Sequence, residues 1–280
     1  MRPLLMCELL ALSTSQPGRL TFSLRTLASR GGMNGTTHDG WGVAFYQGAD
    51  VALFREPLAA DGSALVNFLE TRGPSTNLAI SHIRHATQGA VKFSNTQPFM
   101  RELGGRTHVF AHNGDLPGIE GILRLAAYRP VGQTDSEYAF CVLLGRMQSL
   151  WSEADLPALD ARLSLLATFA ADLRQIGPAN FLYADSDVLF AHGHRRLKNG
   201  RGHTEPPGLW TLQQHCAAAD SPPTQQAGVS IGEQERVSLL IASVPLTGEA
   251  WQPMPEGELV AVRYGQLIAT RASATATATG

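Results

Sequence analysis

The chain has 280 residues, of which 44% are hydrophobic, and a formal net charge of −2 at pH 7. This composition suffices for a packed core, and the near-neutral charge gives no electrostatic reason to expect nucleic acid or an anionic membrane as a partner. Three widely spaced cysteines argue against a disulfide framework and indicate a reducing, cytoplasmic location. No apolar run reaches the ~20 residues of a membrane span. A signal sequence is not expected, because Glu8 interrupts the short apolar start.

Along the first half of the chain, hydrophobic patterning predicts mainly strands. The expected elements are a buried strand over 7–12, a turn over 13–18, a hairpin over 41–46 and 51–54, a helix over 65–69, and strands over 77–84 and 107–112. The glycine-rich stretch 30–40 is predicted to be a loop. Asn113-Gly114 is a turn dipeptide that should close the last of these strands.

The second half begins with helices and returns to strands. Thr134 and Glu137 have the spacing of a capping box, so a helix should follow over 139–144. The further expectations are a helix over 156–176, a hairpin over 181–184 and 188–191, a basic loop over 192–208, a polar stretch over 213–235, and strands over 237–242 and 259–262. The order lacks βαβ periodicity, which predicts a layered α+β fold. We expect one domain over 7–265 and a low-complexity tail over 266–280.

Cys7 is the first candidate for chemistry, because Met6 stands directly before it. If residues 1–6 are absent or removed, which we expect, Cys7 carries a free α-amino group beside its thiol. Such an amine titrates near ~8, so it can take a proton from an adjacent nucleophile. A single cysteine is more often a buried core residue, so the catalytic interpretation depends on the rest of the chain.

Three further polar clusters follow predicted strands or turns, where catalytic groups concentrate. An Asn side chain and a glycine N–H, as at Asn113 and Gly114, can stabilise an oxyanion. A guanidinium such as Arg84 can bind a carboxylate, and a carboxylate such as Asp135 can hold an ammonium. Together they indicate a site for an amino acid with a carbonyl that Cys7 can attack.

The order of these motifs resembles the class II glutamine amidotransferases, which are N-terminal-nucleophile hydrolases. The likeness is carried by Cys7, His-Ile-Arg-His-Ala-Thr, Asn-Thr-Gln-Pro-Phe, His-Asn-Gly and Thr-Asp-Ser-Glu. It is strongest to the small single-domain members related to the ergothioneine-pathway γ-glutamyl hydrolase and the glutathione-degradation amidotransferase. The resemblance implies a four-layer αββα sandwich and no metal or cofactor.

The same resemblance implies a role for each matching residue. Cys7 would be the nucleophile with its own α-amine as base, and Asn113 and Gly114 would form the oxyanion hole. Arg84 would bind the α-carboxylate of a glutamine or γ-glutamyl group and Asp135 its α-amine, with Thr87 lining the pocket. The expected activity is cleavage of a γ-amide through a γ-glutamyl thioester, with release of glutamate.

Several alternatives stay open at this stage. Gln97 stands where the family commonly has histidine, which leaves room for a binding or regulatory module without turnover. An N-terminal-nucleophile amidase for another acyl group is a further alternative, and the ammonia could pass to a synthase subunit. The pairs His82-x-x-His85 and His108-x-x-x-His112 could suggest a metal site, but on strands and loops that spacing does not converge by itself. We expect small-molecule substrates, and an oligomer is compatible with the sequence.

Overall fold

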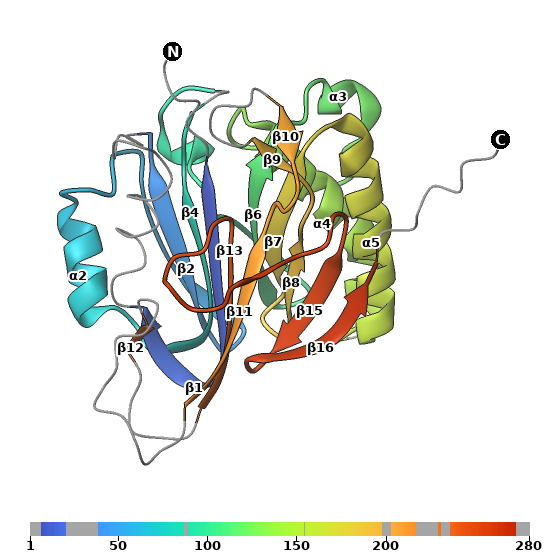
Figure 1. Ribbon diagram of the computed structural model, residues 1–280. Coiled ribbons are helices and arrows are strands. Elements are labelled where there is room, and N and C mark those ends of the chain that lie inside the picture. The colour runs from blue at the N-terminus through green and yellow to red at the C-terminus, as the bar shows by residue number, and fades with distance from the viewer. Residues whose placement is uncertain are drawn as a thin grey trace.

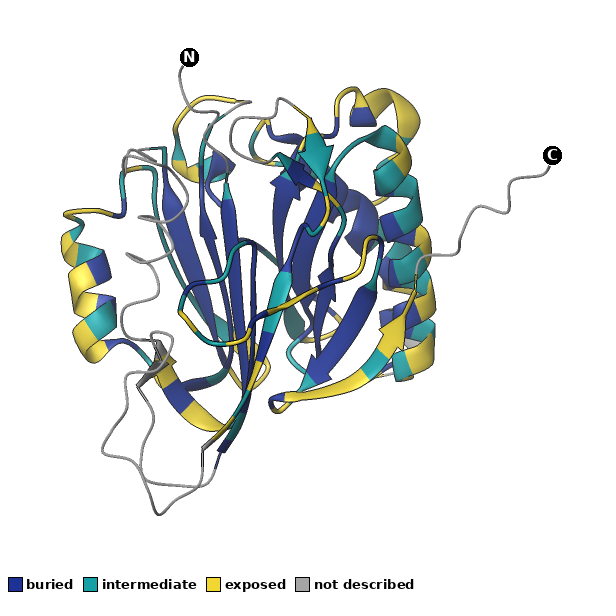
Figure 2. Ribbon diagram, in the orientation of Figure 1, coloured by how far each residue is buried: buried dark blue, intermediate teal, exposed yellow. Residues whose placement is uncertain are grey.

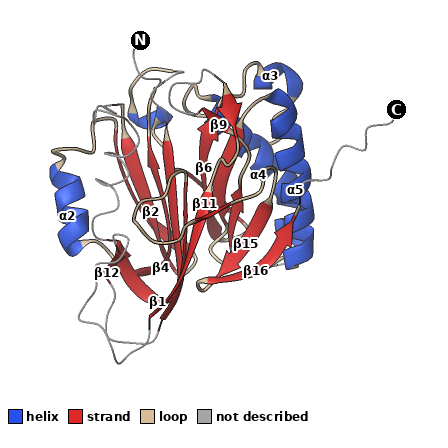
Figure 3. Ribbon diagram, viewed as in Figure 1, coloured by secondary structure: helices blue, strands red, loops and turns tan. Residues whose placement is uncertain are grey.

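The structure is a computed structural model that describes residues 7–20, 39–86, 89–153, 155–197, 203–216, 229–230 and 236–272. Its centre is a pair of stacked, mostly antiparallel β-sheets, with helices on the two outer faces (Figures 1 and 3). This is the four-layer αββα arrangement that the sequence comparison implied. The Thr87 side chain, to which the sequence assigns a place in the substrate pocket, lies outside the described residues.

The first sheet places the N-terminal strand in its middle. Its order is β14-β11-β13-β1-β4-β2-β3, with β12 paired to β1. The strands are β1 (Glu8–Leu20), β2 (Trp41–Gln47), β3 (Asp50–Glu56), β4 (Thr76–Ile83), β11 (Trp210–Cys216), β12 (Val229–Ser230), β13 (Arg236–Ala242) and β14 (Gln252–Pro253). Because β1 has β4 on one side and β13 on the other, its backbone is held at both edges directly after Cys7.

The second sheet has the order β16-β15-β8-β7-β6-β5. Its strands are β5 (Phe99–Leu103), β6 (Arg106–Gly114), β7 (Ala179–Ala184), β8 (Leu189–His192), β15 (Leu259–Arg263) and β16 (Gln266–Arg271). A separate two-stranded hairpin consists of β9 (Arg196–Leu197) and β10 (Thr204–Glu205), and a 3-10 turn, η1 (Phe93–Asn95), precedes β5. In Figure 1 the hairpin β9–β10 and the helix α3 (Ile119–Ile122) both lie at the upper edge of the sandwich.

The outer layers are helical. On the first sheet, α2 (Ala64–Arg72) buries Val66 and Leu69 against Trp41 and neighbouring core residues. On the second sheet, α4 (Asp135–Glu153) and α5 (Leu159–Ile176) bury a larger apolar cluster. None of the helices formed by the described residues has the length and apolar content needed to cross a bilayer.

Alternation along the strands divides the core into three layers. Leu9 and Ala11 of β1 face Val109 and Ala111 of β6 between the sheets, whereas Leu10 and other residues point outward to the α2 layer. Side chains on successive residues point to opposite faces of a strand, so the run from Leu9 to Leu12 in β1 is apolar because both of its faces are covered. Figure 2 shows the resulting buried strands at the centre.

Most predicted elements are confirmed, but several segments differ from the prediction. The turn expected over 13–18 is part of β1, which continues through a register irregularity between Ser13 and Gly18. Asn113-Gly114 does not form a hairpin turn, because both residues pair with β7 as the last residues of β6. Finally, β11 occupies part of the predicted polar stretch, and β16 occupies the first part of the predicted tail.

A buried ion-pair network joins the helical layer to the lower end of the second sheet. Arg162 of α5 contacts Asp185 at 2.8 Å and Asp187 at 2.9 Å, and Arg263 contacts Asp187 at 2.6 Å. The Arg162 side chain is only 1% exposed and lies over the Phe190 ring. Two carboxylates share two guanidinium groups here, so each buried charge is compensated.

We expect Arg162→Leu to lower the free energy of unfolding by about 3–5 kcal/mol, because the buried Asp185 loses its counter-charge. Arg146 offers a matched control, since it also pairs with an aspartate, Asp172, and lies over a phenylalanine ring, but it is 30% exposed. Arg146→Leu should cost less than about 1 kcal/mol. Urea unfolding monitored by circular dichroism measures both, and equal losses would contradict the interpretation.

Candidate active site

Two strands from different sheets bring the candidate residues together at one end of the sandwich. Cys7 directly precedes β1, and Asn113 and Gly114 end β6. The Asn113 side chain donates from Nδ2 to the Cys7 carbonyl oxygen at 2.5 Å. Since β1 and β6 belong to opposite sheets, this contact crosses the interface between them and places the amide next to the thiol residue.

The Cys7 thiol is tied to the loop after β4. Its Sγ donates to the His85 carbonyl at 3.3 Å and accepts from the His85 N–H at 3.2 Å. Burial raises the pKa of Cys7 to about 11, although the His85 N–H and the Arg84 charge act in the opposite direction. At neutral pH the thiol therefore keeps its proton, so nucleophilic attack requires a base in contact with it.

Arg84 follows β4 and is 3% exposed. Its guanidinium donates to the carbonyls of Gly89 at 3.0 Å and Ala90 at 3.3 Å, which fixes the start of the next loop. Burial lowers the pKa of Arg84, while the Cys7 and Asp39 charges favour its protonated form. In turn, the positive charge of Arg84 acts to lower the pKa of Cys7.

Asp135 is the first residue of α4 and supplies a negative charge to the same region, since it raises the pKa of Cys7. Its Oδ2 accepts from the Leu116 N–H at 2.8 Å and its Oδ1 from the Ser136 N–H at 2.7 Å. Each carboxylate oxygen has more than one lone-pair site. Asp135 is therefore held rigidly and retains capacity to accept from a ligand ammonium.

The end of β6 is packed too tightly for any side chain at Gly114. A Cβ at this position would lie 1.8 Å from the Pro178 carbonyl oxygen and 2.6 Å from the His112 Nε2. Asn113, just before it, is 3% exposed, and its carbonyl accepts from the Asn180 Nδ2 at 3.0 Å. Glycine is thus required by close approach rather than by a turn.

The predicted capping box at the start of α4 is confirmed in its first half. The Thr134 hydroxyl accepts from the Glu137 N–H at 3.2 Å. The Glu137 carboxylate instead accepts from the N–H groups of Val131 and Gly132, and it pairs with Arg101 at 2.5 Å. Glu137 therefore secures the loop that precedes Asp135.

The histidines that suggested a metal site lie on β4, on the loop after it and on β6. His82 lies in the core, where burial lowers its pKa to about 3. His112 contacts the Ser136 hydroxyl at 2.9 Å, and His108 contacts the Tyr183 hydroxyl at 2.7 Å. His85 faces Asp39 at 3.5 Å. In the described part of the chain, no three His, Cys, Asp or Glu side chains form a group suited to a metal ion.

Other residues that support the site carried little or no signal in the sequence. Glu8 is 1% exposed and pairs with Arg196 at 2.7 Å, which connects the start of β1 to the β9 segment. Asn180 accepts from the His194 N–H at 2.7 Å and donates to Asn113. Glu8 belongs to an apolar run and Asn180 to a predicted hairpin, so their partners are visible only in the fold.

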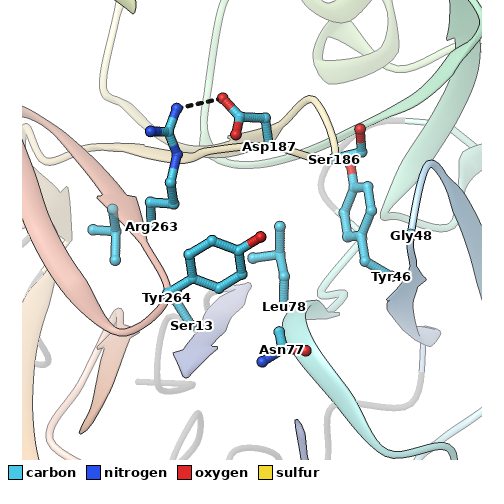
Figure 4. A pocket seen from close by; sticks show the side chains of 10 residues that line it. Ser13, Tyr46, Gly48, Asn77, Leu78, Ser186, Asp187, Arg263 and Tyr264 are labelled. Carbon is cyan, nitrogen blue, oxygen red and sulfur yellow. Dashed lines mark hydrogen bonds and ion pairs between the residues drawn. The ribbon is translucent and has the colours of Figure 1, made fainter. Parts of the chain in front are cut away.

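A polar pocket is present away from Cys7 (Figure 4). It is lined by residues that include Ser13, Tyr46, Asn77 and Tyr264, with the Asp187–Arg263 ion pair on one side. Ser13 is six residues beyond Cys7 along β1, a separation of roughly 20 Å in a strand. This pocket is therefore distinct from the Cys7 region.

Comparison with known proteins identifies the family of the chain. Residues 6–279 match the family described as class II glutamine amidotransferases. The chain belongs to this family. "Putative glutamine amidotransferase YafJ" of Escherichia coli K12 is 35% identical over 254 residues, which cover 90% of this chain and 96% of that protein. A "Putative glutamine amidotransferase" of Haemophilus influenzae is 29% identical over 273 residues, covering 94% of this chain and 86% of that protein.

Solved structures support the family and the fold. The crystal structure of a "predicted glutamine amidotransferase" from Pseudomonas aeruginosa PA01 has a TM-score of 0.66 and 32% identity, and the match covers 94% of this chain and 100% of that chain. The glutamine phosphoribosylpyrophosphate amidotransferase of B. subtilis, at 15% identity and a TM-score of 0.54, shares the fold, and the match covers 96% of this chain and 50% of that chain. Family membership supports hydrolysis of the glutamine amide.

In protein that retains Met6, we expect the alkylation rate of Cys7 by iodoacetamide to increase about tenfold per pH unit up to pH 10, because only the thiolate reacts and burial raises the thiol pKa to about 11. Mass spectrometry of the Cys7 peptide gives the rate. Cys7→Ala protein controls for other cysteines, of which Cys141 is buried. A plateau near the ordinary pKa of a cysteine, about 8.5, would contradict the effect of burial.

Proposed function

We propose that this amidotransferase cleaves the γ-amide of glutamine or of a γ-glutamyl compound through a thioester on Cys7. The observation that carries the proposal is the hydrogen bond from the Asn113 carboxamide to the Cys7 carbonyl oxygen, at 2.5 Å. The Arg84 charge acts to lower the pKa of the Cys7 thiol, and the Asp135 charge acts to raise it. Asn113 thus supplies a hydrogen-bond donor, and the two charged residues match the α-carboxylate and α-amine of a glutamyl group.

The first step uses the α-amine of Cys7 in protein from which residues 1–6 are absent. The amine takes the thiol proton, and Sγ attacks the γ-carbonyl carbon. The oxyanion that develops is stabilised by the Asn113 carboxamide and the Gly114 N–H, which are fixed before the reaction and so need no reorganisation. The protonated amine then returns its proton to the leaving nitrogen, so ammonia or an amine departs and the γ-glutamyl thioester remains.

The second step resolves the thioester with water. The same α-amine, again neutral, takes a proton from water as the oxygen attacks the thioester carbonyl, and the C–S bond breaks. Glutamate leaves, and the protonated α-amine gives its proton to the Cys7 sulfur, which restores the free thiol and the neutral amine. An amine beside the thiol solves the problem posed by the raised pKa of Cys7, since the proton has a short path to a base at neutral pH.

Recognition of the glutamyl group would divide between two elements. Arg84, after β4, would hold the α-carboxylate, and Asp135, at the start of α4, would hold the α-amine, with Thr87 beside them. Both charges are anchored by backbone contacts of the protein, so they are positioned before substrate arrives. Transfer of the ammonia to a synthase subunit is the alternative to its release into solution.

The reaction itself is tested with protein that begins at Cys7, obtained by cleavage of a fusion directly before this residue. We expect it to release glutamate from L-glutamine or from a γ-glutamyl amide, as measured by an enzyme-coupled glutamate assay, and to form a thioester adduct detectable by intact mass. Cys7→Ala should remove both signals. Absence of glutamate release from every γ-glutamyl compound would refute the proposal, and free ammonia in step with glutamate would favour simple hydrolysis over transfer.

Substrate analogues separate the two recognition roles. We expect Asp135→Asn to lower kcat/KM for L-glutamine by about tenfold to a hundredfold, the value of one charged contact of about 1.5–3 kcal/mol, but to change little for glutaramic acid, which lacks the α-amine. Arg84→Met should show the same pattern with 4-aminobutanamide, which lacks the α-carboxylate. Equal losses for glutamine and its analogue would indicate an amidase for another acyl group.

A further inference from the structure

The β5–β6 ladder stops two residues short of the candidate oxyanion hole. Its last pair joins Phe99 to Phe110. The same register carried two residues further would place Gln97 opposite His112. The intervening Pro98 has no N–H to give to a ladder. The edge of β6 that faces β5 therefore lacks a backbone partner at His112, directly before Asn113.

The Gln97 side chain takes the place of that missing strand. Its Nε2 donates to the His112 carbonyl at 3.1 Å, and its Oε1 accepts from the His112 N–H at 2.7 Å. Gln97 is 5% exposed, so the pairing is shielded from water. A carboxamide carries a donor and an acceptor side by side, and it thus reproduces both hydrogen bonds that a peptide group of β5 would form.

The opposite edge of β6 is held in a comparable way. β7 pairs with β6 as far as Gly114, and the Asn180 Nδ2 donates to the Asn113 carbonyl at 3.0 Å. One buried carboxamide therefore holds each edge of β6: Gln97 holds His112 on the β5 side, and Asn180 holds Asn113 on the β7 side. The Asn113 side chain and the Gly114 N–H are carried on this same short segment, so their direction depends on these contacts.

We propose that Gln97 is a positioning residue of the oxyanion hole: its carboxamide completes the β5 edge at His112 and thereby fixes the direction of the Asn113 and Gly114 donors. The inference rests on the proposed function, in which these donors act on the oxyanion. Among the described residues, the Gln97 side chain forms its hydrogen bonds with His112. None of them reaches Cys7, Arg84 or Asp135. Loss of its pairing should therefore reduce turnover rather than substrate binding.

Two substitutions at Gln97 test this in protein that begins at Cys7. Gln97→Met keeps the length of the side chain and removes both hydrogen bonds. We expect kcat for glutamate release to fall by about 10- to 100-fold, at or below the loss seen when an oxyanion donor is removed outright, while KM changes by less than about threefold.

Gln97→Glu adds a readout that a merely structural role would not produce. Its ionised carboxylate accepts from the His112 N–H but repels the His112 carbonyl, whereas its protonated form again offers an acceptor and an O–H donor. The ratio of kcat for Gln97→Glu to kcat for the unsubstituted protein should therefore rise as the pH falls. Taking the ratio at each pH removes the effect of protonating the α-amine, which both proteins share.

Gln213→Met is the matched control. The Gln213 carboxamide also gives two backbone hydrogen bonds, to Ser238 at 3.0 Å and to Gly265 at 2.8 Å. It lies on β11 opposite Leu239, which pairs with Ser13, at the end of the sheet remote from Cys7. Its loss should leave kcat unchanged.

Hydrogen exchange at the His112 amide gives a second measurement that does not require turnover. We expect faster exchange in Gln97→Met and no change in Gln213→Met. If the protein that begins at Cys7 releases glutamate but Gln97→Met retains its kcat, or if exchange at His112 is unchanged, the inference about Gln97 is overturned. If the unsubstituted protein releases no glutamate, the proposed function fails first, and the positioning role fails with it.

Discussion

The contact between the first residue before β1 and the last residues of β6 is the constraint on which the site depends. Cys7 and Asn113 are more than a hundred residues apart in sequence, and their strands lie in different sheets. Their side-by-side position is set by the packing of Leu9 and Ala11 against Val109 and Ala111 between those sheets. The apolar interior thus determines the distance between the proposed nucleophile and the proposed oxyanion donor.

Burial creates a second constraint at the same point. Removing the thiol from water disfavours its ionised form, which is why the Cys7 pKa is raised to about 11. A nearby guanidinium and a backbone N–H offset this only in part. A base in immediate contact is the chemical solution, and the α-amine of an N-terminal Cys7 is attached to the same residue. The raised pKa of Cys7 thus calls for a base, and the proposed removal of residues 1–6 would supply one.

Backbone groups near the site pair with polar side chains where the strands end. Gln97 pairs with His112 where β5 stops, Asn180 connects β6 to the His194 segment, and Glu137 accepts from the loop before α4. Buried backbone groups must be paired, and a ladder cannot supply partners beyond its last residue. These side chains hold the last residues of β6 and the loop that precedes Asp135.

The sequence by itself determined the order of most strands and helices, the layered α+β class and the motifs around Cys7, Arg84, Asn113 and Asp135. These are local signals, because alternation, capping and motif spacing depend on near neighbours along the chain. The turns predicted over residues 13–18 and at Asn113-Gly114 are wrong, because pairing with a distant strand overrides turn propensity at both places. Only the tertiary structure decided which polar residues meet: the Gln97 carboxamide at His112, Glu8 with Arg196, and the close approach at Gly114. Each of these contacts joins residues at least 15 positions apart in the sequence, so local patterning along the chain does not reveal it.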